Sequence, residues 1–209
     1  MTGKVRIKVC GVTHPDDAQA AVDAGVDLIG LNFVSNSPRR LDLKQAEVIA
    51  SRVGGQIERV AVFRDAALEE IERILRRIDV ERIQFHGSET PEVVQEVDLP
   101  VIKAVAGADL EVAERYPGTI LLLDHPTRGG GQGQAWNWAD AFDLIAAGHD
   151  VILAGGLSPS NVGQALDSLQ DLLPWGVDVA TGVEAEAHRK DLKLLRDFID
   201  AVRKTEAGA

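Results

Sequence analysis

The chain has 209 residues with a formal net charge of −11, and 45% of its residues are hydrophobic. This length favours one domain over residues 1–209, and a single cysteine excludes an internal disulfide. The excess of acidic residues argues against nucleic-acid binding. No apolar run approaches the roughly 20 residues of a membrane span, and no signal peptide is evident. We therefore expect a cytoplasmic protein.

Short β-branched runs alternate with amphipathic helical stretches along the whole chain. The predicted strands are 5–9, 28–33, 57–63, 82–85, 101–105, 120–123, 151–154 and 177–179. The predicted helices are 16–24, 43–53, 67–78, 91–97, 109–116, 138–147, 159–169 and 188–204. Thr90-Pro91 and Ser158-Pro159 each place a capping hydroxyl before a proline, as at a helix start.

Eight such units are the number that closes a (β/α)8 TIM barrel, and we predict this α/β fold. A doubly wound open sheet is the alternative, but eight strands with single-helix connections in so short a chain suit a closed ring better. Catalytic residues of a barrel lie at the C-terminal ends of its strands. Those positions are Cys10, Asn32, Phe63, Arg64, His86, Lys103, Asp124, Gly155, Gly156 and 178–182.

Cys10 ends the first predicted strand and is followed by Gly11. A free cysteine is most often a small buried hydrophobe. Here, however, Gly11 has no side chain and so lets a ligand approach. Groups of a bound substrate and the N-terminus of the first helix can favour the thiolate form of Cys10. Cys10 is therefore a candidate for acid–base chemistry.

Arg39 lies in the loop after the second predicted strand. In so acidic a chain, an arginine on the active face is a candidate anchor for a substrate carboxylate. The adjacent Arg40 leaves open which of the two is only a solvated surface charge.

Asp124 follows four apolar residues at the end of the sixth strand. Partial burial there would favour the protonated carboxyl that a general acid needs. An isolated aspartate is more often a cap, but the glycine-rich stretch 128–134 resembles a lid over a ligand. Cys10 and Asp124 come from roughly opposite sides of the ring, so they could flank a substrate as base and acid.

Glycine-rich turns follow the seventh and eighth strands. They contain Gly155 and Gly156 in the first turn, and Thr181 and Gly182 in the second. A single glycine more often serves a tight turn, but these two loops are the usual phosphate site of a barrel. We therefore expect a phosphorylated small-molecule ligand. The five histidines show no metal-binding spacing, and we predict no metal site.

Ordered motifs extend this interpretation to a family. They are KVCGVT at 8–13, GLNF at 30–33 with SPR at 37–39, QFHG at 84–87, VIKA at 101–104, LLD at 122–124, LAGGL at 153–157, and GVDV at 176–179 with GVE at 182–184. In these motifs the sequence resembles phosphoribosylanthranilate isomerase, the (β/α)8 enzyme of tryptophan biosynthesis.

The resemblance implies an Amadori rearrangement of N-(5-phosphoribosyl)anthranilate to 1-(2-carboxyphenylamino)-1-deoxyribulose 5-phosphate without a cofactor. It implies that Asp124 protonates the furanose ring oxygen and that Cys10, as thiolate, removes the C2′ proton. Arg39 would hold the anthranilate carboxylate, and backbone groups after strands seven and eight would hold the phosphate. The oligomeric state, monomer or homodimer, stays open.

Two departures from the family pattern affect the phosphate loop and the lid. Ala180-Thr181 replaces the usual Ser-Ser, and the sequence at 131–138 lacks several usual lid residues. One alternative is the aminoaldose isomerase of histidine biosynthesis, which has an aspartate at the base position, so Cys10 argues against it. Another is a barrel that binds a phosphorylated ligand as a sensor, without turnover.

Overall fold

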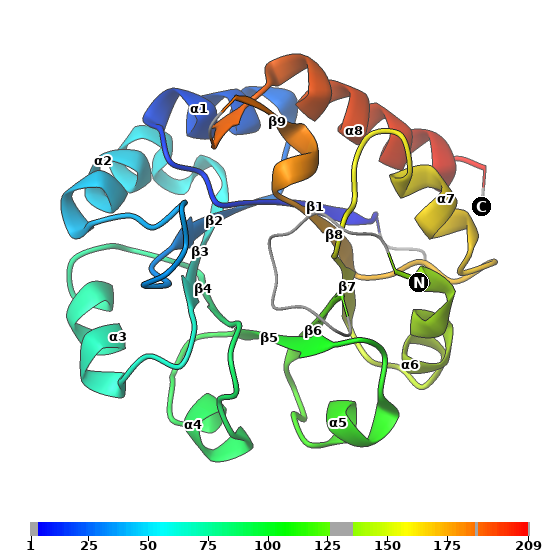
Figure 1. The fold of residues 1–209 in the computed structure, drawn as a ribbon, viewed down its shortest axis with the longest axis horizontal. Helices are drawn as coiled ribbons and strands as arrows, with labels where there is room; N and C mark the ends of the chain where they lie inside the picture. Colours follow the sequence, from blue (N-terminus) through cyan, green and yellow to red (C-terminus); the bar gives the residue numbers. More distant parts are fainter. Residues whose placement is uncertain (1–3, 126–135, 187, 209) are drawn as a thin grey trace.

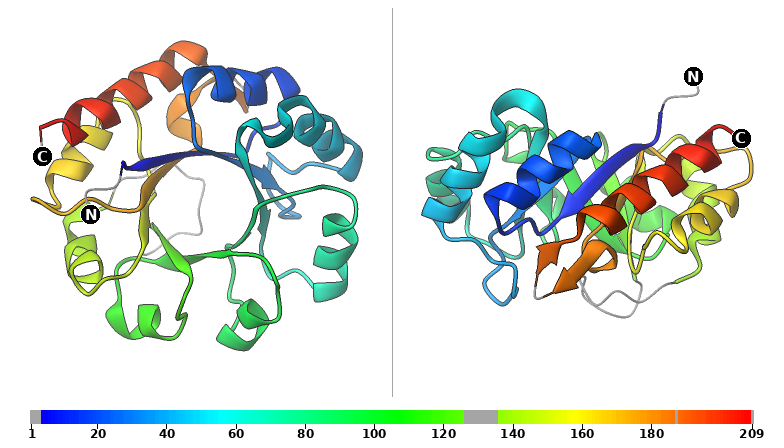
Figure 2. Two further views of the ribbon diagram at one scale, coloured as in Figure 1. Left: turned by 180° about the vertical axis from the view of Figure 1, so that it is seen from behind. Right: turned by 90° about the horizontal axis from the view of Figure 1, so that it is seen from above.

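Eight parallel strands form a closed barrel in a computed structural model that describes residues 4–125, 136–186 and 188–208. The strands follow one another around the ring in chain order, and β8 pairs with β1 to close it. Figure 1 shows the ring of strands surrounded by the helices, and Figure 2 shows the same arrangement from behind and from above. The predicted (β/α)8 barrel is confirmed, and the open sheet is excluded.

The barrel strands are β1 (Arg6–Cys10), β2 (Leu28–Asn32), β3 (Glu58–Phe63), β4 (Arg82–Phe85), β5 (Val101–Ala106), β6 (Ile120–Asp124), β7 (Val151–Leu153) and β8 (Gly176–Val179). The α-helices are α1 (Pro15–Ala24), α2 (Leu43–Val53), α3 (Leu68–Leu75), α4 (Pro91–Gln95), α5 (Leu110–Glu114), α6 (Phe142–Ala146), α7 (Val162–Asp167) and α8 (Leu192–Glu206). Short 3-10 turns are η1 (Gly54–Gln56), η2 (Trp138–Ala141) and η3 (Thr181–Val183). No helix within these described residues has both the length and the apolar character to cross a membrane.

The start of α7 differs from the prediction. The helix begins at Val162 rather than at Pro159. Asn161 accepts a hydrogen bond from Ser158 N at 2.7 Å and donates one to Gly156 O at 2.9 Å. Because this side chain holds the loop after β7 in an irregular turn, the helix starts three residues later. The predicted start of α4 at Pro91 is confirmed.

The start of the last helix was also predicted too early. A small antiparallel hairpin precedes it, made of β9 (Glu184–Glu186) and β10 (Arg189–Lys190), and α8 starts at Leu192. Arg189 pairs with Asp17 of α1 at 2.8 Å. This long-range ion pair stabilises the hairpin, and it could not be predicted from the local sequence pattern.

The core has two layers. Most apolar strand residues pack outward against the helices, and a smaller group fills the barrel itself: Leu28, Val60, Ile102, Ala104, Ile120, Leu122, Ile152 and Ala154, with Trp175 packed against it. Arg6 and Arg82 lie over the Trp175 ring at 4.7 and 5.4 Å from its centroid. Both also pair with Glu58, at 2.7 and 2.9 Å. These four side chains close the end of the barrel where the strands begin, so the opposite end is left for a ligand.

Candidate active site

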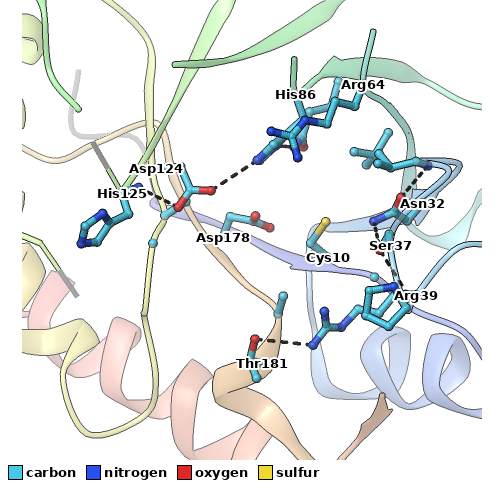
Figure 3. A pocket seen from close by; sticks show the side chains of 18 of the residues that line it. Cys10, Asn32, Ser37, Arg39, Arg64, His86, Asp124, His125, Asp178 and Thr181 are labelled. Atoms are coloured by element: carbon cyan, nitrogen blue, oxygen red, sulfur yellow. Dashed lines mark hydrogen bonds and ion pairs between the residues drawn. The ribbon is translucent and has the colours of Figure 1, made fainter. Parts of the chain in front are cut away.

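A pocket of about 340 Å³ opens at the C-terminal ends of the barrel strands. All seven residues predicted for the site line it: Cys10, Arg39, Asp124, Gly155, Gly156, Thr181 and Gly182. Figure 3 shows Asp124 and Cys10 on different sides of this pocket. Their strands, β6 and β1, are separated in the ring by β7 and β8. The predicted lid at 128–134 lies outside the described residues.

Cys10 is partly exposed to the pocket at the end of β1. A Cβ atom on Gly30 of the neighbouring strand would lie 2.8 Å from the Cys10 sulfur, so the thiol occupies space that only a glycine leaves free. Burial raises the pKa of the Cys10 thiol, and the positive charge of Lys8 opposes this rise. Burial of the thiol therefore opposes the thiolate expected from the sequence.

Lys8 is a buried charged residue behind the pocket wall that the sequence interpretation did not consider. It lies two residues before Cys10 on the same strand, and its Nζ donates to Asp178 Oδ1 at 2.9 Å. Both side chains are buried, and the two residues are direct register partners between β1 and β8. Burial alone lowers the pKa of Lys8, but the Asp178 carboxylate raises it, with a net upward shift. The strand period of two places Lys8 on the same face as Cys10, and this signal could have identified it.

Asp124 is held by hydrogen-bonding groups on two sides. The His125 backbone N–H donates to Oδ1 at 2.7 Å, and His86 Nε2 lies 3.3 Å from Oδ2. On the other side of the imidazole, Gln84 Nε2 lies 2.8 Å from His86 Nδ1. This chain of side chains fixes the direction in which the Asp124 carboxyl faces the pocket.

Arg39, not Arg40, is the arginine of the pocket. Arg39 is 8% exposed, whereas Arg40 is exposed and outside the pocket lining. Ser37 Oγ accepts from Arg39 N at 3.2 Å and from Asn32 Nδ2 at 3.1 Å, which orders the loop. The Arg39 side chain then runs along the pocket to Glu184, with Nε and Nη2 donating at 2.8 and 2.7 Å.

The two glycine turns touch each other at the pocket wall. Gly155 and Gly156 have φ of 76° and 75°, a left-handed conformation that favours glycine. A Cβ on Gly182 would lie 2.1 Å from the carbonyl oxygen of Leu157, so only glycine fits there. Backbone without side chains therefore lines this part of the pocket, as a phosphate site requires.

Two residues from the strand-end positions lie elsewhere. Phe63 stacks on Phe33 with ring centroids 5.5 Å apart, in the layer between strands and helices. Lys103 pairs with Glu89 at 3.1 Å and is buried outside the pocket lining. Both side chains point outward because inward and outward positions alternate along a strand. Within the described part of the chain, no group of three or more His, Cys, Asp or Glu residues could hold a metal ion.

Comparison with known proteins identifies the family. The family model for N-(5′-phosphoribosyl)anthranilate (PRA) isomerase matches residues 7–201, nearly the whole chain. The chain belongs to the PRA isomerase family. The curated PRA isomerase of Myxococcus xanthus is 42% identical over 207 residues, covering 95% of this chain and 96% of the relative.

Solved PRA isomerase structures resemble this chain in fold as well as in sequence. The crystal structure from Thermus thermophilus superposes with a TM-score of 0.86 at 34% identity, covering 96% of this chain and 99% of that one. Another PRA isomerase was solved in complex with reduced 1-(o-carboxyphenylamino)-1-deoxyribulose 5-phosphate, with a TM-score of 0.85, 30% identity and the same coverage.

Proposed function

We propose that the pocket uses Cys10 as general base and Asp124 as general acid in the rearrangement of N-(5-phosphoribosyl)anthranilate to 1-(2-carboxyphenylamino)-1-deoxyribulose 5-phosphate. The chain is a PRA isomerase of tryptophan biosynthesis, an aldose–ketose isomerase. The observation that carries the residue assignment is the lining of one pocket by a thiol, a carboxyl, an arginine and two glycine turns.

The first step is ring opening. Asp124 donates its proton to the furanose ring oxygen, the bond between this oxygen and C1′ breaks, and the anilino nitrogen supplies the electron pair that forms an iminium at C1′. His86 keeps the Asp124 carboxyl turned toward the pocket during this transfer. Positioned proton transfer of this kind contributes roughly 10²- to 10⁴-fold to a rate.

The second step removes the C2′ proton. The iminium withdraws electrons from C2′ and brings a positive charge close to Cys10, which together with Lys8 favours the thiolate that burial disfavours. The Cys10 thiolate takes the proton, the electron pair of the broken C–H bond forms the C1′–C2′ double bond, and the π pair of the iminium returns to the anilino nitrogen, which gives an enolamine. Protonation at C1′ and loss of the hydroxyl proton at C2′ then give the ketone.

The remaining groups hold the substrate. Arg39 binds the anthranilate carboxylate, and the backbone N–H groups around Gly155, Gly156, Thr181 and Gly182 bind the phosphate. Backbone contacts do not require the family's usual serines, so Ala180-Thr181 is compatible with this role. We also propose that residues 1–209 form one domain, that the protein acts in the cytoplasm, and that it needs no cofactor.

A coupled assay tests the function. Anthranilate and phosphoribosyl pyrophosphate are converted by an anthranilate phosphoribosyltransferase, and addition of this chain is followed through loss of the fluorescence of the anthranilate derivative. We expect catalytic loss of fluorescence. A protein that binds the reduced product but never turns the substrate over would instead be the sensor considered above.

A further inference from the structure

The guanidinium of Arg39 already has a carboxylate partner inside the pocket wall. Its Nε and Nη2 donate in parallel to the two carboxylate oxygens of Glu184, and Nη2 also lies 3.5 Å from Thr181 Oγ1. The side chains of Arg39 and Glu184 are only 9% and 8% exposed. Nε and Nη2 of the guanidinium therefore already have acceptors. Nη1 has none among the described residues, so it can donate to a ligand.

Glu184 is shared with a second buried cation. Lys190 Nζ donates to Glu184 Oε1 at 2.7 Å and to the Ala180 carbonyl at 3.0 Å, and its side chain is 1% exposed. His188 Nδ1 lies 4.0 Å from Glu184 Oε2. The two positive charges of Arg39 and Lys190 face the one negative charge of Glu184, so these three side chains carry one excess positive charge. One carboxylate on a ligand would balance it.

The fold holds this cluster next to the reacting groups. A Cβ on Gly11 would lie 2.4 Å from Arg39 Cδ, so the stem of Arg39 passes directly over the residue that follows Cys10. From the other side, Asp17 of α1 accepts hydrogen bonds from Arg189 and from the Lys190 backbone N–H at 3.0 Å. The hairpin β9–β10 therefore carries Glu184 and Lys190 to Arg39 on a fixed support.

We propose that Glu184 and Lys190 determine specificity for a substrate that carries a single aromatic carboxylate. Glu184 fixes Arg39 so that its outer N–H groups face the pocket, and Lys190 supplies the positive charge that the substrate carboxylate neutralises. Both are positioning residues: Glu184 acts through Arg39, and Lys190, which is outside the pocket lining, acts through its charge and its hydrogen bond to Glu184. This inference rests on the role of Arg39 as carboxylate anchor in the proposed function.

The test compares two ligands by calorimetry. One is the borohydride-reduced product, and the other is the same compound without its ring carboxylate. The dissociation constant of the carboxylate-free compound divided by that of the reduced product measures recognition of the carboxylate alone. We expect Glu184→Gln to lower this ratio by roughly tenfold because the Arg39 guanidinium loses the partner that fixes its direction, and Lys190→Met to lower it by a similar factor because a buried positive charge is lost. Both variants should leave the affinity for the carboxylate-free compound within about twofold. Glu186→Gln, on the exposed end of β9, is the matched control and keeps the ratio.

A purely structural role gives a different result. If Glu184→Gln and Lys190→Met weaken both ligands equally, the ratio is unchanged and the proposal is overturned. Arg39→Met distinguishes a failure of the specificity proposal from a failure of Arg39 as the carboxylate anchor. If it lowers the ratio while the other two variants do not, the specificity proposal fails and the role of Arg39 stands; if it does not, the anchor itself is wrong. Should Glu184→Gln fail to fold, Lys190→Met decides the test.

Discussion

Cys10 and its neighbour Lys8 illustrate how one residue's chemistry depends on another. The thiol is placed at a strand end where burial opposes its ionisation, and the charge of Lys8 makes the largest opposing contribution. Its strand-end position and the following Gly11 made Cys10 a candidate, because strand ends can be predicted from β-branched runs and glycine turns. Lys8 stands within an apolar run and its partner Asp178 is 170 residues away, so the ion pair could not be predicted from local sequence.

Substitution Lys8→Met should move the acidic limb of the pH profile of kcat/KM to higher pH. Removing the ammonium destabilises the Cys10 thiolate, so the pKa of the thiol rises further and less base is present at neutral pH. We expect kcat/KM at pH 7 to fall by roughly tenfold.

The exposed Lys4 gives the matched control, since Lys4→Met removes the same charge far from the thiol. The Asp178 carboxylate loses its partner in Lys8→Met, so circular dichroism must first establish that the variant is folded. A folded Lys8→Met variant with the wild-type profile would show that Lys8 does not act on Cys10.

The elements were predictable to different degrees. The eight barrel strands were predicted to within one residue at each end, because buried parallel strands give continuous apolar runs between turn residues. The start of α8 was predicted too early because the hairpin at 184–190 depends on ion pairs to α1 and to Arg39. For the same reason, Glu184 and Lys190 were absent from the predicted site, although Glu184 belongs to the motif Gly182-Val183-Glu184.

Gly182→Ala should damage the contact between the loops after β7 and β8. The new methyl group would lie 2.1 Å from the Leu157 carbonyl oxygen, so one loop must move. We expect a loss of about 2 kcal/mol in the free energy of unfolding and a KM increase of roughly tenfold from a displaced phosphate site. Urea unfolding and steady-state kinetics measure the two effects.

Gly55→Ala is the control for this change. A Cβ on Gly55 meets no atom within 4 Å, and its φ of −85° is accessible to alanine. This variant should keep the wild-type KM. A Gly182→Ala enzyme with unchanged KM would argue against phosphate binding at this turn.

At the scale of the whole molecule, the candidate site and the cluster that closes the barrel lie at opposite ends. The pocket opens at the strand ends, while Arg6, Glu58, Arg82 and Trp175 close the end where the strands begin. The number of βα units made the barrel predictable. The cluster that closes the other end of the barrel could not be predicted, because its members come from three separate strands and one loop.

Glu58→Gln should lower stability without changing catalysis. Burial raises the pKa of Glu58, but hydrogen bonds from Arg6 and Arg82 outweigh burial and hold it below its ordinary value of 4.5. A depressed carboxyl pKa stabilises the fold above that ordinary value, and this contribution is lost as pH falls through the folded-state pKa. Because Glu58 is partly exposed, we expect a loss of at most about 1 kcal/mol at neutral pH.

Urea unfolding of wild type and Glu58→Gln between neutral and acidic pH checks this expectation. The difference between the two proteins should shrink on acidification, while kcat stays within about twofold. Glu69→Gln, at an exposed position of α3, should follow the wild type. A difference that is constant across pH would mean that the ionised carboxylate of Glu58 contributes nothing.

The turnover of Cys10→Ala, measured in the coupled assay, tests the central claim most directly. The account predicts a folded protein with wild-type thermal unfolding and a kcat lower by about a hundredfold or more, because no other group replaces the base. Asp124→Asn should lose turnover to a similar extent through the missing acid. A folded Cys10→Ala enzyme with a kcat close to that of the wild type would contradict the assignment of Cys10 as the base.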